Sequence, residues 1–390
     1  MDHDRNAGGQ KELKEQVIDA GLCTGCGACV HLCPYQAAYK DQIIVMDPCH
    51  GATGRCYVYC PVTPADLEAI RDDLYPQAEP TPELGVVKDF YITRAADPAV
   101  RQAGQHGGTV TALIALAIEA GLVDGAVLTG DQTSHLPESR LIRHPEEALL
   151  LGGSRFMVSP TVAAYHRAAG SDLKKIGVVA TPCQTLALAK IRDQARRNGE
   201  PDRLGLVIGL FCGWALSWLK FKALLDRRIK DAAVLGMDIP PSRYQFMEIR
   251  TDRGLEQIEL EDVWPCIREA CRFCPDMTAE FSDLSVGSAR LPEGWSEARS
   301  WNQVIVRSEL GGEIMDLARR KAILEFREVP PGNLDRLKRA ADKKKKAGLA
   351  ALSGKGVFTD HLIRLYGRDS TRFRHEMDRI TVFDGASLNV

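Results

Sequence analysis

The spacing of the first seven cysteines constrains this chain more than any other feature. They occupy two stretches, CTGCGACVHLCP with Cys23, Cys26, Cys29 and Cys33, and CHGATGRCYVYCP with Cys49, Cys56 and Cys60. The first spacing, Cys-x2-Cys-x2-Cys-x3-Cys-Pro, is that of a bacterial ferredoxin, in which the last cysteine of a run ligates the other cluster. A Cys-Pro pair ends both runs, so the pattern predicts one [4Fe–4S] cubane held by Cys23, Cys26, Cys29 and Cys60. A structural zinc ribbon is the alternative for cysteine pairs of this kind.

The second run lacks one cysteine. Cys33, Cys49 and Cys56 are predicted to hold a second cluster, but Ala52 stands where a regular fourth ligand would lie. We therefore expect either a three-iron cluster or a cubane with an unusual fourth ligand. His50 is the candidate, since imidazole replaces thiolate on iron in some clusters. A merely exposed histidine is the alternative.

Composition bears on the compartment and on the partners. Twelve cysteines in 390 residues, clustered rather than scattered, favour metal binding in a reducing compartment over a disulfide framework. A net charge of -2 gives no reason to expect a nucleic acid or an anionic membrane as partner. No apolar run approaches the roughly 18 residues of a spanning helix, and the polar start MDHDRNAGGQKELKEQ lacks the apolar segment of a secretory signal. We expect a cytoplasmic protein without a transmembrane segment.

The chain divides into four parts that differ in composition and in sequence pattern. Residues 1–74 are predicted to form a small ferredoxin-like α+β domain, and the three prolines of YPQAEPTPELG (75–85) indicate a linker. In residues 86–330, strand-like runs alternate with helical patterns, which predicts an α/β core with a mostly parallel sheet and flanking helices. Residues 331–390 form an extension of unknown role, in which the stretch 334–346, ending in DKKKK, is a charged helix or a solvated tail. For its lysines we expect a solvated face.

Strands are expected at 87–94, 123–131, 175–183, 204–212 and 302–308, and helices at 107–121, 159–169, 185–197 and 312–323.

The core contains a second group of cysteines. Cys183 and Cys212 each end a predicted strand, and the carboxyl ends of strands are where open α/β sheets bind ligands. Cys271 and Cys274 form a Cys-x2-Cys pair further along, and Cys266 precedes them. The three segments can converge on one further cubane.

Six segments carry a family resemblance: QHGGTVTALIALAIEAGLVDGAV, GGSRFMVSP, TPCQ, GLFCG, CRFCPDMTAEFSDLSVGS and VIVRSELGGEIMDLA. Together, over residues 85–347, they resemble the beta-subunit family of coenzyme F420-reducing hydrogenase and dehydrogenase. The resemblance implies FAD and one [4Fe–4S] cluster in the core. It assigns this cluster to Cys183, Cys212, Cys271 and Cys274, and leaves Cys266 as a buried thiol or a substitute ligand.

The flavin site is expected at two glycine-containing loops. Gly104, Gly107 and Gly108 precede a predicted helix whose first turn holds Thr109 and Thr111, and glycine loops at helix N-termini suit phosphate groups. Gly153, Ser154 and Arg155 add a possible bidentate phosphate clamp. A helix cap with a surface arginine would explain the same residues. The resemblance favours the flavin and extends its site to Thr181, Gln184 and Ser288.

Three further expectations concern neighbouring residues and function. His106 is either close to the flavin ring or a solvated surface group, and Asp283, Ser285 and Gly287 either touch the flavin or hold their loop. No side chain is assigned a catalytic role, because FAD itself couples hydride transfer to single-electron transfer.

The resemblance implies a subunit that moves electrons between a hydride carrier such as coenzyme F420 and the clusters of a hydrogenase, formate dehydrogenase, heterodisulfide reductase or ferredoxin-type partner. The alternatives are a ferredoxin-fed reductase of an organic or tetrapyrrole substrate, and a relay adaptor with no small substrate.

Overall fold

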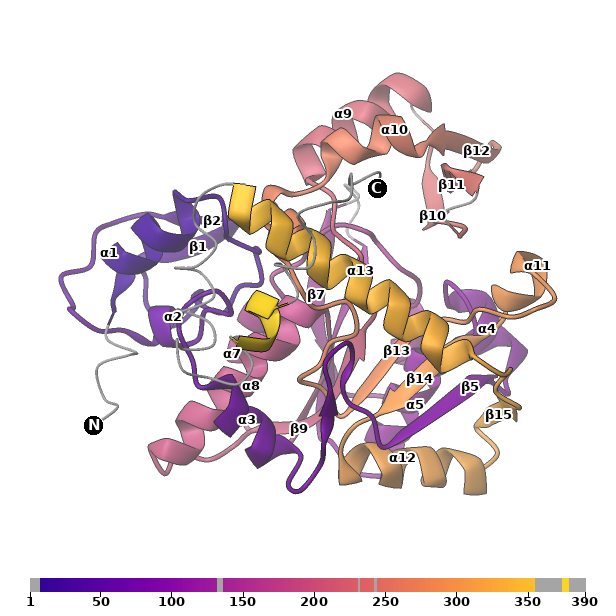
Figure 1. Ribbon diagram of the computed structural model, residues 1–390, viewed down its shortest axis with the longest axis horizontal. Coiled ribbons are helices and arrows are strands. Elements are labelled where there is room, and N and C mark those ends of the chain that lie inside the picture. The colour runs from indigo at the N-terminus through magenta and orange to yellow at the C-terminus, as the bar shows by residue number, and fades with distance from the viewer. Residues whose placement is uncertain (1–7, 132–135, 231, 242–243, 355–373, 379–390) are drawn as a thin grey trace.

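An eight-stranded sheet lies at the centre of the protein (Figure 1). The structure is a computed structural model that describes residues 8–131, 136–230, 232–241, 244–354 and 374–378. The strand order is β15-β5-β14-β13-β9-β8-β6-β7. The bounds are β5 Asp89–Ala95, β6 Gly125–Asp131, β7 Pro137–Ile142, β8 Ile176–Ala180, β9 Leu204–Leu210, β13 Leu284–Ser288, β14 Asn302–Val306 and β15 Leu324–Arg327.

The sheet is mixed. Neighbouring strands β6, β8, β9 and β13 are parallel, whereas β7, β14, β5 and β15 pair antiparallel with their neighbours. The predicted α/β core is therefore confirmed, with its parallel part in the middle. Parallel strands are buried on both faces, which explains the almost continuous apolar runs of β8 and β9.

Helices cover both faces of the sheet. Successive side chains of a strand point to opposite faces, so Leu206 and Ile208 of β9 pack on one side with α5 and α12, while Val207 packs on the other with α7 and α8. The helices of the core are α4 Pro98–Ala103, α5 Thr109–Glu119, α6 Glu147–Leu150, α7 Thr161–Ala169, α8 Pro182–Arg197, α11 Trp295–Ala298 and α12 Glu309–Arg320.

Residues 8–74, which we call the head, form the small α+β unit at one end of the molecule in Figure 1. Its elements are α1 Gln10–Leu13, the π-helix η1 Lys14–Ile18, the antiparallel hairpin of β1 Gln36–Tyr39 and β2 Gln42–Val45, α2 Arg55–Val58 and α3 Leu67–Leu74. The predicted ferredoxin-like fold is confirmed for this region; residues 1–7 lie outside the described residues.

The head is docked on the core. The N–H of Val162, at the start of α7, donates to the carbonyl of Cys26 at 3.1 Å. A ring nitrogen of His166 lies 3.0 Å from the carbonyl oxygen of Ala28. Gly27 has a φ of 84°, and a Cβ there would lie 2.9 Å from the backbone nitrogen of Ala163. Only glycine permits both this backbone conformation and this approach.

The stretch expected to be a linker is packed against the core. Tyr75 is buried, and its hydroxyl donates to the carbonyl of Ser282 at 2.8 Å. Leu84 is fully buried between two short paired strands, β3 Pro80–Thr81 and β4 Gly85–Val86, and packs with Ile305 of the sheet. The prolines thus shape an ordered connection rather than a solvated spacer.

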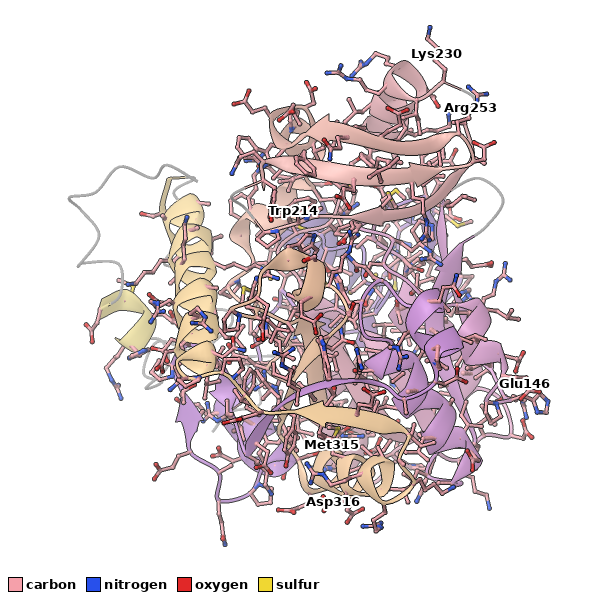
Figure 2. The ribbon with its side chains drawn as sticks, turned by 90° about the vertical axis from the view of Figure 1, so that its right-hand side faces the viewer. Glu146, Trp214, Lys230, Arg253, Met315 and Asp316 are labelled. Atoms are coloured by element: carbon pink, nitrogen blue, oxygen red, sulfur yellow. The ribbon has the colours of Figure 1, made fainter. Side chains whose placement is uncertain are left out.

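A three-stranded antiparallel sheet projects from the core. Its strands are β10 Val234–Asp238, β11 Phe246–Thr251 and β12 Gly254–Glu259, flanked by α9 Trp218–Arg228 and α10 Leu260–Val263 and followed by the 3-10 helices η3 Trp264–Cys266 and η4 Glu269–Phe273. Figure 2 shows Lys230 and Arg253 at its tip, opposite Met315 and Asp316 of α12. The projection has its own apolar core, in which Cys266 is buried.

The last long helix, α13 Asn333–Gly354, crosses the molecule from core to head (Figure 1). Leu337 packs with core residues, and Leu352 packs in the apolar cluster that contains Leu13 of the head. The solvated face expected for its lysines is wrong for Lys345, which is buried and paired with Glu280 at 2.6 Å. Of the extension, residues 355–373 and 379–390 lie outside the described residues. No described helix combines the length and the apolar character needed to cross a membrane.

Candidate redox centre

Four core cysteines meet at the carboxyl edge of the parallel strands. Cys183 lies in the first turn of α8 after β8, Cys212 follows β9, and Cys271 and Cys274 come from η4 and the residue after it. Burial raises the pKa of the Cys183 thiol to about 12, and the neighbouring thiols of Cys274 and Cys271 contribute to that rise. Burial and the same neighbours also raise the pKa of Cys212. Buried thiols that oppose one another's ionisation are suited to a centre that supplies positive charge, because metal binding requires thiolates.

A cavity adjoins two of these four cysteines. A cavity of about 110 Å³ is lined by Cys183 and Cys274, and by Leu22 of the head and Phe273 of the core. Among the described residues, no group of three or more His, Cys, Asp or Glu side chains is arranged to hold a metal ion. Thiolates around a cubane stand further apart than those around one ion, because iron and sulfide atoms fill the space between them.

Cys23, Cys26, Cys29 and Cys60 come together at the side of the head that faces the core. Burial is the main reason that the pKa of Cys29 is raised well above its usual value, and the thiols of Cys26, Cys60 and Cys23 add to it. Burial raises the pKa of Cys60 to about 11. The structure thus places side by side the four cysteines that the ferredoxin spacing selects.

Cys33, Cys49 and Cys56 form a third group on the outer side of the head. The pKa of Cys56 is raised by burial and, to a smaller extent, by the thiols of Cys33 and Cys49. Cys33 and Cys49 are partly exposed. His50 and Ala52 lie in the same loop, where both are exposed. The structure thus gathers three thiols here, and the identity of a fourth ligand stays a prediction.

The three groups form a continuous series. Cys56 contributes to the raised pKa of Cys29, which links the outer and inner groups of the head. Cys183 likewise contributes to the raised pKa of Cys26, across the boundary between head and core. Thr24 lies at this boundary, where its hydroxyl hydrogen-bonds the sulfur atoms of both Cys26 and Cys183.

Two lysines beside the cysteines were missed by sequence reasoning. The ammonium of Lys190 in α8 donates to the carbonyls of Cys60 and Thr63 at 2.6 and 3.1 Å. Burial lowers the pKa of Lys190 to about 8, an effect that the thiols of Cys60 and Cys26 oppose. Lys344 of α13 donates to the carbonyls of Cys212 and Asp276. The inner cysteine group of the head and the cysteine group of the core therefore each have a lysine next to them.

The two glycine loops expected at a flavin lie against each other. A Cβ at Gly152 would come within 2.5 Å of the carbonyl oxygen of Ala103, next to Gly104. Gly104, Gly153, Ser154, Arg155, Thr181 and Ser288 remain at least partly exposed.

Other residues of the expected flavin site are buried and make hydrogen bonds within the protein. Thr109 is fully buried, with its hydroxyl 3.0 Å from that of Thr93 and its N–H donating to Asn302. Thr111 is buried in α5 as well. Gln184 caps α8 by accepting from the N–H of Thr181 at 2.8 Å, and its amide donates to the carbonyl of Ser159.

The glycines near Thr109 likewise serve packing. A Cβ at Gly107 would lie 2.8 Å from the side-chain oxygen of Asn302, and Gly108 has a φ of 73°. Packing and backbone conformation therefore require glycine at both positions, whether or not a ligand binds there.

His106 is a buried group rather than the solvated one considered as an alternative. Its Nδ1 lies 3.1 Å from the hydroxyl of Ser288 and its Nε2 lies 3.3 Å from a carboxylate oxygen of Asp238. The ring packs edge-on against Trp295. His106 therefore ties the glycine loop to β13 and to the projecting sheet.

The loop before β13 is held from within. Asp283 accepts from the N–H of Val207 and from the hydroxyl of Ser308, and the Ser285 hydroxyl accepts from buried Arg307. A Cβ at Gly287 would collide with the ring of Phe211. These contacts explain the polar residues of this loop by packing alone.

A ferredoxin-like head on an α/β core that has its own group of four neighbouring cysteines defines an iron–sulfur redox protein. Comparison with known proteins agrees with this class. Residues 90–166 and 173–331 match the N-terminal and C-terminal parts of the family described as "Coenzyme F420 hydrogenase/dehydrogenase, beta subunit", and residues 17–39 match a 4Fe-4S binding domain.

Individual relatives support the same assignment. An uncharacterized protein from Methanocaldococcus jannaschii is 30% identical over 330 residues, which are 77% of this chain and 88% of that protein. A subunit of the F(420)H(2) dehydrogenase from Methanosarcina mazei is 27% identical over 350 residues, 85% of this chain and 91% of that subunit. The coenzyme F420-dependent sulfite reductase of M. jannaschii is 27% identical over 83% of this chain, which spans only 50% of that enzyme.

The fold has a solved counterpart. A chain of the F420-reducing [NiFe] hydrogenase complex from Methanosarcina barkeri matches with a TM-score of 0.64 and 25% identity, over 72% of this chain and 96% of that one. The chain belongs to the coenzyme F420 hydrogenase/dehydrogenase beta-subunit family.

Proposed function

We propose that this protein is the subunit of a redox complex that moves electrons between coenzyme F420 and the iron–sulfur clusters of a partner protein, with FAD bound in its core. The names of its relatives, which include hydrogenase and dehydrogenase subunits that act with F420, support the carrier. The observation that carries the proposal is the unbroken series of cysteine groups from the core to the outer side of the head.

On the basis of this series, we assign eleven cysteines to three clusters. The core cluster takes Cys183, Cys212, Cys271 and Cys274, the inner head cluster takes Cys23, Cys26, Cys29 and Cys60, and the outer head cluster takes Cys33, Cys49 and Cys56. Cys26 and Cys183 stand on either side of the boundary between head and core, so clusters held by these two groups would let electrons cross there within the protein. The partly exposed Cys33 and Cys49 make the outer cluster the exit toward a partner.

The residues that would hold a flavin are the exposed or partly exposed Gly104, Gly153, Ser154 and Arg155 of the two adjoining loops, together with Thr181 at the start of α8 and Ser288 at the end of β13. Bound FAD would supply the exchange between a two-electron hydride carrier and one-electron clusters. Thr181 connects the two sites, because its hydroxyl lies 3.5 Å from the sulfur of Cys183. Thr109, Thr111 and Gln184 support the site from behind.

The test is a cofactor count on protein purified without oxygen. We expect about eleven or twelve irons, corresponding to two cubanes and one incomplete or irregular cluster, and one FAD per chain. Reduced F420 should bleach the flavin. A Cys212→Ser variant should lose about four irons, whereas Cys266→Ser, at the buried thiol of the projection, should lose none.

Three results would overturn parts of the proposal. Four irons or fewer would remove the three-cluster arrangement, and stoichiometric zinc would favour a structural metal site. A flavin that neither F420 nor a nicotinamide can bleach would favour a relay adaptor without a small substrate.

A further inference from the structure

We propose that Lys344 sets the reduction potential of the core cluster, by holding a fixed positive charge against the loops that carry its ligands. The inference rests on the proposed cluster at Cys183, Cys212, Cys271 and Cys274, and it adds a residue that the family resemblance does not assign. It gives the charged run DKKKK a role in redox chemistry rather than on the surface.

The packing of α13 places the charge. A Cβ at Gly348 would lie 3.0 Å from the carbonyl oxygen of Cys274, so the helix passes directly over the loop of that cysteine. Lys344 lies one turn earlier on the same face, because residues four apart are neighbours on a helix. Its ammonium donates to the carbonyl of Cys212 at 2.6 Å and to that of Asp276 at 2.7 Å. One side chain therefore joins the two loops that supply Cys212 and Cys274.

The charge is directed at the loops that carry the cysteines. Both hydrogen bonds of the ammonium go to neutral carbonyl groups. The adjacent Lys345 differs, because Glu280 pairs with it at 2.6 Å and neutralises its charge.

The effect on the cluster has a definite sign. Reduction adds one negative charge to the cluster, and a nearby positive charge in a poorly polarisable interior stabilises the reduced form more than the oxidised form. Local charge is one of the factors that set cluster potentials. Lys344 should therefore raise the potential of the core cluster, which makes it a better acceptor for electrons arriving from the flavin side.

The experiment is a redox titration followed by EPR on anaerobically purified protein. Four forms are compared: wild type, Lys344→Gln, Lys344→Arg and Lys343→Gln. Gln keeps a hydrogen-bond donor and removes the charge, and Arg keeps the charge. Lys343 is exposed and adjacent in sequence, so it is the matched control. The core signal is identified as the one that Cys212→Ser removes.

We expect Lys344→Gln to lower the equilibrium constant for one-electron reduction of the core cluster at least tenfold, about 59 mV toward negative potential. Lys344→Arg and Lys343→Gln should leave it near the wild-type value. An unchanged potential in Lys344→Gln with full iron content would overturn the proposal. Loss of the core cluster in both Lys344→Gln and Lys344→Arg would also overturn it, since the lysine would then be needed for assembly.

If the wild type has no signal that Cys212→Ser removes, the core cluster itself is absent. That result contradicts the proposed function and is distinguishable from a failure of the lysine proposal.

Discussion

The two cysteine groups of the head look alike in sequence and differ in surroundings. Cys26, Cys29 and Cys60 are buried at 6, 8 and 8% exposure, with α7 and the core against them. Cys33 and Cys49 are partly exposed, and the Cys49 loop is closed by the start of the chain, where Gln10 accepts from the N–H of Cys49 at 2.7 Å. If both groups hold the proposed clusters, one ferredoxin-like unit provides an interior relay and a surface terminal.

The difference comes from docking rather than from the cysteine motif. Gly25 has a φ of 71°, and a Cβ there would lie 2.8 Å from Val158 of the core. Together with Gly27 it lets the first cysteine loop lie flat on the core. The second loop is less covered, so the same spacing rules lead to a more exposed site.

The largest expected effect comes from removing one cysteine ligand from either the inner or the outer cluster of the head. Cys26→Ala should remove about four irons and lower the unfolding temperature, because the cluster holds the docked loop together and metal binding is coupled to folding. Cys33→Ala should remove the outer cluster with a smaller loss of stability. Iron analysis and thermal unfolding measure both effects.

If the core binds FAD as proposed, bleaching of this flavin by reduced F420 should survive in both variants, because it needs only the core. Reduction of a one-electron dye served by the head should fall sharply in both. Equal thermal shifts for the two variants would contradict the distinction between relay and terminal.

The next effect tests the docking itself. Arg268 and Asp41 form an ion pair of 2.8 Å with side-chain exposures of 9 and 2%, and Arg268 also donates to the carbonyl of Cys23. Arg268→Met should destabilise the protein by about 3–5 kcal/mol, since it leaves a buried carboxylate without its partner. Arg143→Met, in an exposed 2.8 Å pair with Asp172, should cost about 1 kcal/mol or less. Urea unfolding of both variants measures the change in the free energy of unfolding. Similar changes in the two variants would mean that water reaches the Arg268–Asp41 pair between head and core.

A smaller change sharpens the outer site. Ala52→Cys should supply the missing thiolate, add about one iron and remove any EPR signal of an oxidised three-iron cluster. Ala52→Ser, which adds a hydroxyl of similar size, is the control. If Ala52→Cys leaves the spectrum of the outer cluster unchanged, the fourth ligand is already present, and His50 is the first residue to replace.

The smallest effect concerns the boundary between relay and core. Thr24→Val removes the hydroxyl that hydrogen-bonds the sulfurs of Cys26 and Cys183, a loss of about 1 kcal/mol. Hydrogen bonds to the sulfurs raise cluster potentials, so the inner head cluster and the core cluster should both shift toward negative potential, while the outer one stays unchanged. Thr24→Ser should restore both values. A shift in the outer cluster alone would contradict this position for Thr24.

The order of the elements and the grouping of the head cysteines could be predicted from sequence, for physical reasons. Strands such as β9 are short apolar runs, and helices such as α5 follow glycines. In both cases the local sequence pattern indicates the same element that the fold contains. The ferredoxin spacing is fixed by cluster size, which explains why the same groups recur in the structure.

What could not be predicted depends on contacts between distant segments. Tyr75 lies in a proline-rich stretch that looks like a spacer, and only its hydrogen bond to the carbonyl of Ser282 explains its burial. Gly107 looks like part of a phosphate loop, yet Asn302 fills the space beside it. Lys345 looks solvated, although Leu337, Ala341, Lys345 and Leu352 follow a helical stripe that would have revealed it.

The path of α13 has a consequence for synthesis of the protein. The helix is translated last among the long described elements, yet Leu349 and Leu352 cover the apolar cluster that contains Leu13 and Val17, which are translated far earlier. Domains generally fold as units in the order in which they are made. Here the head is not covered by its final neighbour until nearly the whole of this sequence has left the ribosome. The apolar cluster of the head therefore lacks the side chains of Leu349 and Leu352 until α13 has been made.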